Sequence, residues 1–291
     1  MAPAKKDQIR ALLKSIETGD PGPVAVVNEA KYIQHNPQTQ EGSEVLAALF
    51  KRLSETNPRI NVVRAFEDGD FVFGHTEYDF ATRRIGFEVF RFEAGQAVEH
   101  WDNIQARLGP NEAGRSLVDG PVDAVDLGQT ESNRTLVRSF VETVLIGGQL
   151  DRLSEFVADD FAEHNPRLTD GVSALRAALG AGDIDYHKIH RVLAEGNFVL
   201  CVSEGEIGGI HSALYDLFRA QGQSWWNTGT PPRRSRPGVN GRTITGSSEH
   251  PGLRLRALNG GVGGLTPKLL PRPCGEGPFP NETQFYQGAP L

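Results

Sequence analysis

The sequence has few cysteines and no long apolar segment. Only two of its 291 residues are cysteines, Cys201 and Cys274, and they lie far apart, so neither a disulfide framework nor a cysteine-based zinc site is expected. No apolar run is long enough to cross a membrane, and the opening string MAPAKKDQIR lacks the apolar core of a signal peptide. We therefore expect a cytoplasmic protein with no membrane partner.

The sequence also lacks the motifs of nucleotide cofactors and of serine hydrolases. It has no Gly-x-Gly-x-x-Gly after a strand pattern, no phosphate-binding loop and no Gly-x-Ser-x-Gly. His35, His75 and His100 could be combined into a zinc site, but their spacing follows no metal signature. The formal net charge of −7 argues against nucleic acid as a partner. The sequence thus predicts a protein that works without nucleic acid, metal or cofactor.

Charge and composition change near residue 222. Residues 1–221 hold 34 acidic and 22 basic side chains, whereas residues 222–291 hold 3 and 8. Glycine and proline make up 23 of those last 70 residues, and no window there shows a helical or strand period. We expect a first module over residues 1–125, a second over 126–221, and a disordered tail over 222–291.

The part of the chain before the tail contains one pattern twice. Each copy starts with an amphipathic helical pattern that stops at glycine, over residues 7–19 and 132–148. A second helical stretch, over residues 23–30 in the first copy, leads into the strings YIQHNP at 32–37 and FAEHNP at 161–166, which share aromatic-x-x-His-Asn-Pro. A glycine and a third helical stretch follow in both copies.

Strand patterns replace the helical period in the second part of each copy. Strings rich in Val, Phe and Ile on both sides of Asp68-Gly69 and of Glu195-Gly196 predict β-hairpins with tight turns. The string FEVFRFEAGQAVEHWDNIQ predicts another hairpin that turns at Glu93 to Gln96. We therefore predict an α+β fold of two tandem cone-shaped modules, each with three helices against a curved antiparallel sheet whose open end forms a pocket.

These strings resemble the SnoaL-like branch of the nuclear-transport-factor-2-like superfamily. The resemblance rests on YIQHNP, GHTEYDF and RFEAGQAVEHWDNIQ in the first copy and on FAEHNP and ALYDLFR in the second, and it covers residues 7–105 and 132–221. It implies an α+β cone with an internal cavity, and relatives that include polyketide cyclases, which close a ring by aldol condensation with an aspartate base and no metal or cofactor. Other members isomerise, dehydrate or only bind. It also implies sheet-to-sheet pairing, as an intramolecular pseudo-dimer or a homodimer.

The second copy departs from this pattern where its last strand is due. After ALYDLFR a counterpart of VEHWD is expected, but the sequence continues as SWWNTGTPPRRS. Synonymous codons for Trp225 to Thr230 can encode Val-Glu-His-Trp-Asp in another frame, so we predict a single frameshift near Gln221 to Gln223, from a sequencing error or a genuine lesion. The second module would then lack its last strand and keep an unpaired sheet edge. A damaged product with no function as written is one possible outcome.

The string AVEHWDNIQ carries the candidate catalytic residues. Alternation along a strand puts His100 and Asp102 on one face and Trp101 on the other. If the first face lines the cavity, burial would raise the pKa of Asp102 and make it a general base, while His100 would orient it or donate to an enolate oxygen. The resemblance implies a catalytic carboxylate on this strand. The alternative is a buried His-Asp hydrogen bond that only braces the sheet.

The His-Asn-Pro strings supply further candidates for ligand binding. The proline ends the preceding helical pattern and leaves Tyr32, His35 and Asn36 at a helix-to-loop junction. There they line a pocket or only satisfy backbone groups. His164 and Asn165 hold the matching positions in the second copy, where the tyrosine is replaced by phenylalanine.

His75, Glu88 and Trp101 complete the candidate ligand-binding set. His75 shares a strand face with Glu77 in GHTEYDF, and the second copy has no matching histidine. Glu88 and Asp216 occupy matching positions in the two copies. Either of these carboxylates lines a cavity or forms a surface ion pair with a strand neighbour.

We therefore predict a small-molecule enzyme that abstracts a proton next to a carbonyl and drives aldol-type cyclisation, or a related isomerisation or dehydration. Asp102 would take the proton, and His100 with His35 or Tyr32 would stabilise the oxyanion. The competing hypothesis is a non-catalytic module that binds a small hydrophobic ligand or uses its sheet for dimerisation. The expected partner is a small hydrophobic or β-keto substrate.

Overall fold

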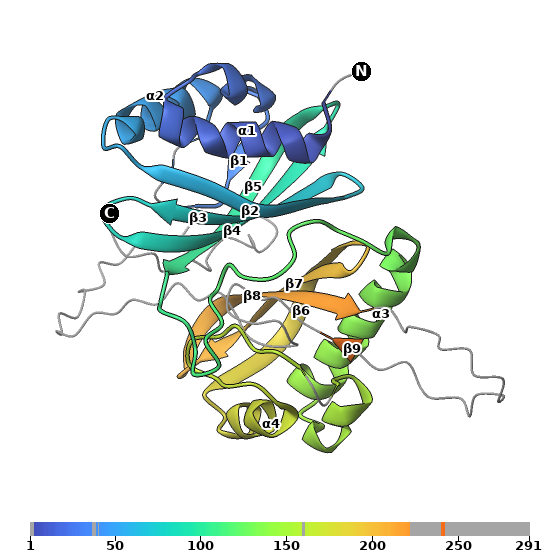
Figure 1. Cartoon of the computed structure of the whole chain (residues 1–291). Coiled ribbons are helices and arrows are strands. Elements are labelled where there is room, and N and C mark those ends of the chain that lie inside the picture. The colour runs from blue at the N-terminus through green and yellow to red at the C-terminus, as the bar shows by residue number, and fades with distance from the viewer. Residues whose placement is uncertain (1–2, 37–38, 40, 159–160, 222–239, 242–291) are drawn as a thin grey trace, which may run out of the picture.

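The computed structural model describes residues 3–36, 39, 41–158, 161–221 and 240–241. Within these residues, helices pack against two curved sheets, one from each half of the chain (Figure 1). The α+β class predicted from the sequence is therefore confirmed. Almost all of the tail, including its predicted disorder, lies outside the described residues. None of the described helices is long and apolar enough to span a membrane.

Two α-helices and a short 3₁₀ helix form the first helical layer. Helix α1 (Lys5–Thr18) ends at Gly19, whose positive φ of 70° closes the last turn. The predicted helix over residues 23–30 is instead the 3₁₀ helix η1 (Gly22–Val26), whose β-branched valines disfavour an α-helix. Helix α2 (Ser43–Ser54) forms as predicted. The buried apolar side of α1 consists of Ile9, Leu12, Leu13 and Ile16.

The first sheet has the strand order β1-β5-β4-β3-β2. Three hairpins connect β2 to β5, and two of their turns fall where the sequence predicts them, at Gly69 and Gly95, which both have positive φ. Strand β1 pairs with β5 in parallel, and the other neighbours are antiparallel. The parallel pair places the His-Asn-Pro string beside the His-Trp-Asp string. The strands are β1 (Ile33–Gln34), β2 (Arg59–Asp68), β3 (Phe71–Asp79), β4 (Arg83–Glu93) and β5 (Gln96–Ala106).

The second half has helices followed by strands in the same order. After the 3₁₀ turn η2 (Leu127–Gln129), helix α3 (Thr130–Phe140) continues into a π-helical turn, η3 (Val141–Ile146). The middle helical stretch is again a 3₁₀ helix, η4 (Leu150–Glu155), and α4 (Val172–Gly180) follows. The sheet has the order β6-β7-β8-β9. Its strands are β6 (Ile184–Glu195), β7 (Phe198–Ile207), β8 (Ile210–Gln221) and β9 (Asn240–Gly241).

The second sheet has no full-length counterpart of β5 among the described strands. Strand β8 pairs with β7 along its length, but it pairs with β9 at two positions only, Ala220 with Gly241 and Gln221 with Asn240. The segment in which a frameshift was predicted lies outside the described residues, so the frameshift stays a prediction.

Three apolar clusters hold the chain together. One packs around α1 and α2 and a second around α3 and α4. The third lies between the two sheets, which face each other in Figure 1. Complete burial of a phenylalanine or leucine side chain contributes roughly 1.5–3 kcal/mol to the stability of a fold. The contact between the halves is therefore a hydrophobic core of its own. It includes Phe66, Phe73 and Phe87 from the first sheet and Phe198, Leu200 and Leu217 from the second.

Candidate active site

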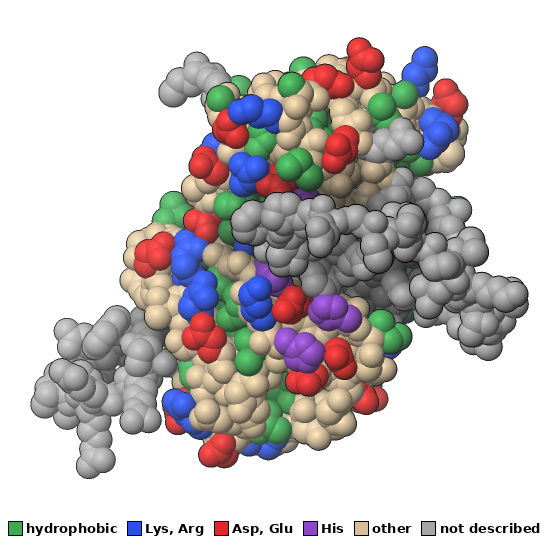
Figure 2. Space-filling model, turned by 180° about the vertical axis from the view of Figure 1, so that it is seen from behind, with side chains coloured by type: hydrophobic (Ala, Val, Ile, Leu, Met, Phe, Trp, Pro, Cys, Tyr) green, Lys and Arg blue, Asp and Glu red, His purple; other side chains and the backbone are tan. Residues whose placement is uncertain are grey.

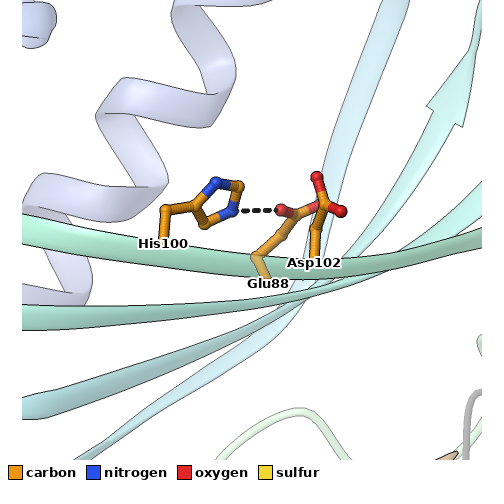
Figure 3. A group of neighbouring side chains, drawn as sticks. All are labelled: Glu88, His100 and Asp102. Atoms are coloured by element: carbon orange, nitrogen blue, oxygen red, sulfur yellow. Dashed lines mark hydrogen bonds and ion pairs between the residues drawn. The ribbon is translucent and has the colours of Figure 1, made fainter. Parts of the chain in front are cut away.

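The first sheet presents three ionisable side chains on the face toward its helices. In the pair of β4 and β5, Glu88 lies opposite Asp102 and Phe90 lies opposite His100. Because paired residues share a face, Glu88, His100 and Asp102 gather on one side of the sheet. Figure 3 shows them side by side, with the His100 ring directed at Glu88. All three are buried, with 2%, 7% and 5% of their surface exposed, respectively.

Strand β1 adds a second row of polar side chains to this face. It lies parallel to β5 with Gln34 opposite His100. Alternation therefore turns Gln34 and Asn36 to the helical side. Asn36 Nδ2 donates a hydrogen bond of 2.6 Å to Asp102 Oδ2, and His100 Nδ1 lies 3.0 Å from Gln34 Oε1. The His-Asn-Pro string thus forms one polar wall of the candidate site.

His100 is held at both ring nitrogens by acceptors. Nδ1 faces the amide oxygen of Gln34 at 3.0 Å, and Nε2 faces Glu88 Oε2 at 2.8 Å. The hydroxyl of Tyr78 donates a hydrogen bond of 2.6 Å to the other oxygen of Glu88. An amide oxygen cannot donate, so Nδ1 carries a proton, and a second proton lies between Nε2 and Glu88. His100 and Glu88 therefore form one proton-sharing pair.

Asp102 has fewer hydrogen-bond partners than Glu88 among the described residues. Its Oδ2 accepts from Asn36, and its other oxygen has no hydrogen bond to another described residue. Burial raises the pKa of Asp102 from its ordinary value of 3.8 to about 6, and the charge of Glu88 adds to the rise, while His100 and Asn36 oppose it. A carboxylate with a pKa near the working pH can accept a proton from a carbon acid.

A tyrosine and a glycine shape the space around the carboxylates. Burial, together with the charges of Glu88 and Asp102, raises the pKa of Tyr32, so its hydroxyl keeps its proton and can donate. The absence of a side chain at Gly86 is also required. A Cβ atom there would lie 2.5 Å from Glu88 Oε1 and 2.6 Å from the ring of Tyr78. Any larger residue at this position would displace both.

His35 and Trp101 lie on the opposite side of β5. Their rings stack with centroids 4.9 Å apart, and His35 Nε2 lies 2.9 Å from Glu99 Oε1. Arg91 Nε donates to the second oxygen of Glu99 at 2.8 Å. Contrary to the prediction, His35 cannot reach an oxyanion beside Asp102, because the alternation that turns its neighbour into the site turns His35 out of it.

His75 lies between the two sheets instead of lining the site. Its Nδ1 accepts a hydrogen bond of 2.7 Å from Arg64 Nη1, and its ring packs on Phe87 with centroids 4.8 Å apart. Burial, with the charges of Arg64 and His164, lowers its pKa well below 6.5, so the ring is neutral. Arg64 also donates to carbonyl oxygens of residues 118–121. This pair therefore fixes the linker between the two halves.

His164 and Asn165 contact the linker and their own loop. His164 Nδ1 lies at a linker carbonyl oxygen, and Asn165 Oδ1 accepts from a backbone N–H two residues on. A buried carboxylate of this half, Asp216, accepts a hydrogen bond of 3.1 Å from the Tyr186 hydroxyl. The structure does not bring His164 or Asn165 to Glu88, His100 and Asp102, which belong to the other sheet.

Two histidines of β6, the exposed His187 and the half-buried His190, pair with carboxylates of the second half. His190 Nε2 is 3.0 Å from Glu204 Oε2, and His187 Nε2 is 3.3 Å from Asp185 Oδ2. Figure 2 shows histidine and acidic side chains together on the lower lobe of the molecule. They lie on a different sheet from the candidate site.

Glu88, His100 and Asp102 also form the described group best suited to a metal ion. One ligand atom of each lies within 4.8 Å of the others. A metal would first have to break the hydrogen bond between His100 and Glu88. The zinc trio considered from the sequence is not gathered, because His35 and His75 lie on the other side of the sheet.

Gln34 and Tyr78 are site residues that the sequence analysis missed. Tyr78 lies on the face of GHTEYDF opposite His75, and the face taken for the pocket was the wrong one. Gln34 lies two residues before Asn36 and so shares its face. Extending the period of two backward from Asn36 would have found it.

No family model and no curated protein matches the chain. Several solved structures match about a third of it. TsrD from Streptomyces laurentii is 18% identical and aligns over 35% of this chain and 91% of its own, with a TM-score of 0.30. Wild-type IdmH, a putative polyketide cyclase from Streptomyces antibioticus, is 16% identical over 34% of this chain and 89% of its own, with a TM-score of 0.30. An NTF2-like protein of unknown function from Cytophaga hutchinsonii is 15% identical over 36% of this chain and 93% of its own, with a TM-score of 0.31.

The names of two of these proteins, an NTF2-like protein and a putative polyketide cyclase, also occur in the superfamily that the sequence resembles. Identities and TM-scores of this size carry no information about activity.

Proposed function

We propose that the first module is an enzyme that abstracts a proton next to a carbonyl group, without a cofactor, in an aldol-type cyclisation or a related isomerisation or dehydration. The observation that carries this proposal is the state of Asp102. It is a buried carboxylate with a pKa raised to about 6 and with one oxygen free of hydrogen bonds to other described residues. Such a group is suited to accept a proton from carbon near neutral pH.

The neighbours of Asp102 suggest how the charge of the reaction is stabilised. The Tyr32 hydroxyl keeps its proton and has no hydrogen-bond partner within the described part of the chain, so it can donate to a developing oxyanion. His100 shares a proton with Glu88 and can supply positive charge as the substrate becomes an enolate. In this proposal Tyr32 replaces His35 as the oxyanion donor.

A non-catalytic pocket protein is the second candidate, and one observation favours it. Both nitrogens of His100 and both oxygens of Glu88 already have partners within the protein. A buried polar network whose hydrogen bonds are all made within the protein can also have a purely structural role, in which it only keeps the core rigid. In that case the module would bind a small hydrophobic ligand without turning it over.

The Asp102→Asn substitution separates these two functions. A panel of β-keto compounds is tested for turnover by mass spectrometry and for binding by calorimetry, with Asp185→Asn on the exposed surface of the second sheet as the control. We expect the Asn variant to lose at least about a hundredfold in turnover, within the range typical of general base removal, and to keep binding. Unchanged turnover would remove Asp102 from its role, and binding without turnover in the parent protein would favour the pocket protein.

We also infer that the two halves are copies of one module that pack as an internal pseudo-dimer. The shared aromatic-x-x-His-Asn-Pro string and the common order of helices and strands support this inference. The apolar cluster between the sheets supports the packing. Separate expression of residues 1–125 tests it, since a half that exposes this cluster is expected to self-associate in analytical ultracentrifugation, and a monomeric, stable half would contradict it.

A further inference from the structure

We infer that the second module positions the catalytic residues of the first, and that Arg191 is the positioning residue. This inference rests on the proposed function. Asp102 lies on β5 between two residues whose side chains both reach the second module. The guanidinium of Arg191, on β6, lies 4.0 Å from the ring centroid of Trp101. On the other side of Asp102, Asn103 Nδ2 donates a hydrogen bond of 3.2 Å to the carbonyl of Ala213 on β8.

The contact with Arg191 continues to the polar wall of the site. Trp101 stacks on the ring of His35, with an interplanar angle of 7°. The N–H of His35 donates to the carbonyl of His100 at 3.0 Å, which fixes the backbone of this short segment against β5. The next residue, Asn36, holds Asp102. A displacement of Trp101 therefore loosens the segment that carries the hydrogen-bond donor to Asp102.

The charge of Arg191 makes this contact more than apolar packing. A guanidinium over an indole ring is attracted by the negative face of the ring, and such a contact shifts an equilibrium by roughly two- to thirtyfold. Arg191 also lies 5.5 Å from the ring centroid of Phe71, at the start of β3. One side chain of the second module thus contacts two strands of the first sheet. The second module contributes to the site in this way.

Backbone hydrogen exchange tests the link directly in the full chain. In Arg191→Ala, the amide of His35 is expected to exchange about three- to tenfold faster, while the amides of α1 stay unchanged. Arg191→Lys keeps a cation near the ring and should give a smaller increase. The matched control is Arg152→Ala, which removes a second-module arginine that lies 5.9 Å from the ring centroid of Phe156, in its own module.

A second measurement distinguishes positioning from a general loosening of the fold. Asn36 opposes the rise in the pKa of Asp102, so dislodging it should raise that pKa further in Arg191→Ala but not in Arg152→Ala, as followed by carboxyl-carbon NMR. Unchanged exchange at His35 in a folded Arg191→Ala variant would overturn the inference. So would faster exchange with an unmoved pKa. If Arg191→Ala does not fold, Arg191→Lys provides the same two tests. Neither readout needs turnover, so failure of the proposed reaction would leave this result standing.

Discussion

Asn36 and Asp102 are 66 residues apart in sequence, and a 2.6 Å hydrogen bond joins their side chains. The bond ties the His-Asn-Pro string to the His-Trp-Asp string. It also counteracts the effect of burial on the pKa of Asp102. An amide donor favours the ionised carboxylate, whereas burial favours the neutral acid. The balance between the two leaves Asp102 with a pKa of about 6.

Asn36→Ala should shift this balance toward the neutral acid. Without the amide donor the pKa of Asp102 is expected to rise further, so turnover at neutral pH falls and the pH–rate profile moves to higher pH. Loss of a hydrogen bond to a charged group, about 1.5–3 kcal/mol, corresponds to roughly one to two pKa units. The control is Asn165→Ala, at the same position in the second string, where the side chain only caps its own loop. Equal shifts in the two variants would contradict the assignment of Asn36.

Tyr78→Phe removes the hydroxyl that holds Glu88 and leaves the ring in place. We expect a loss of about 1.5–3 kcal/mol in the free energy of unfolding, measured by urea denaturation, together with lower turnover. Tyr186→Phe is the matched control, because it breaks the corresponding bond to Asp216 in the second half. That variant should lose stability but keep its turnover. A fall in turnover in both variants would mean that the effect is on folding and not on the site.

Asp102→Asn should change how stability depends on pH. The raised pKa of Asp102 means that the folded state favours the protonated acid, and this contribution is complete below pH 3.8 and lost as pH rises through about 6. Asparagine stays neutral, so the variant should gain stability relative to the parent between pH 4 and pH 7. At about 1.4 kcal/mol per pKa unit the gain is up to about 3 kcal/mol. Urea unfolding at several pH values measures it, and a difference independent of pH would contradict the raised pKa.

Much of this site could be predicted from strand alternation alone. The period of two correctly put His100 and Asp102 on one face and Trp101 on the other. The hairpin turns at Gly69 and Gly95 followed from turn chemistry, since both positions need positive φ.

The sequence could not show which residues of neighbouring strands meet. His35 and Asn36 are adjacent, and only the parallel register of β1 with β5 decides that the asparagine enters the site. The same holds for β3, where His75 was assigned to the pocket although Tyr78, on the other face, reaches Glu88. A buried histidine between two sheets and a pocket histidine have the same local pattern.

A carboxyl-carbon NMR titration of protein labelled at aspartate tests the central claim most directly, with the Asp102 signal assigned by its loss in Asp102→Asn. A buried base in a poorly hydrated site predicts a midpoint of about 6 for this carboxyl group. A midpoint near 3.8, the ordinary value, would show a well-solvated carboxylate and would contradict its role as the base.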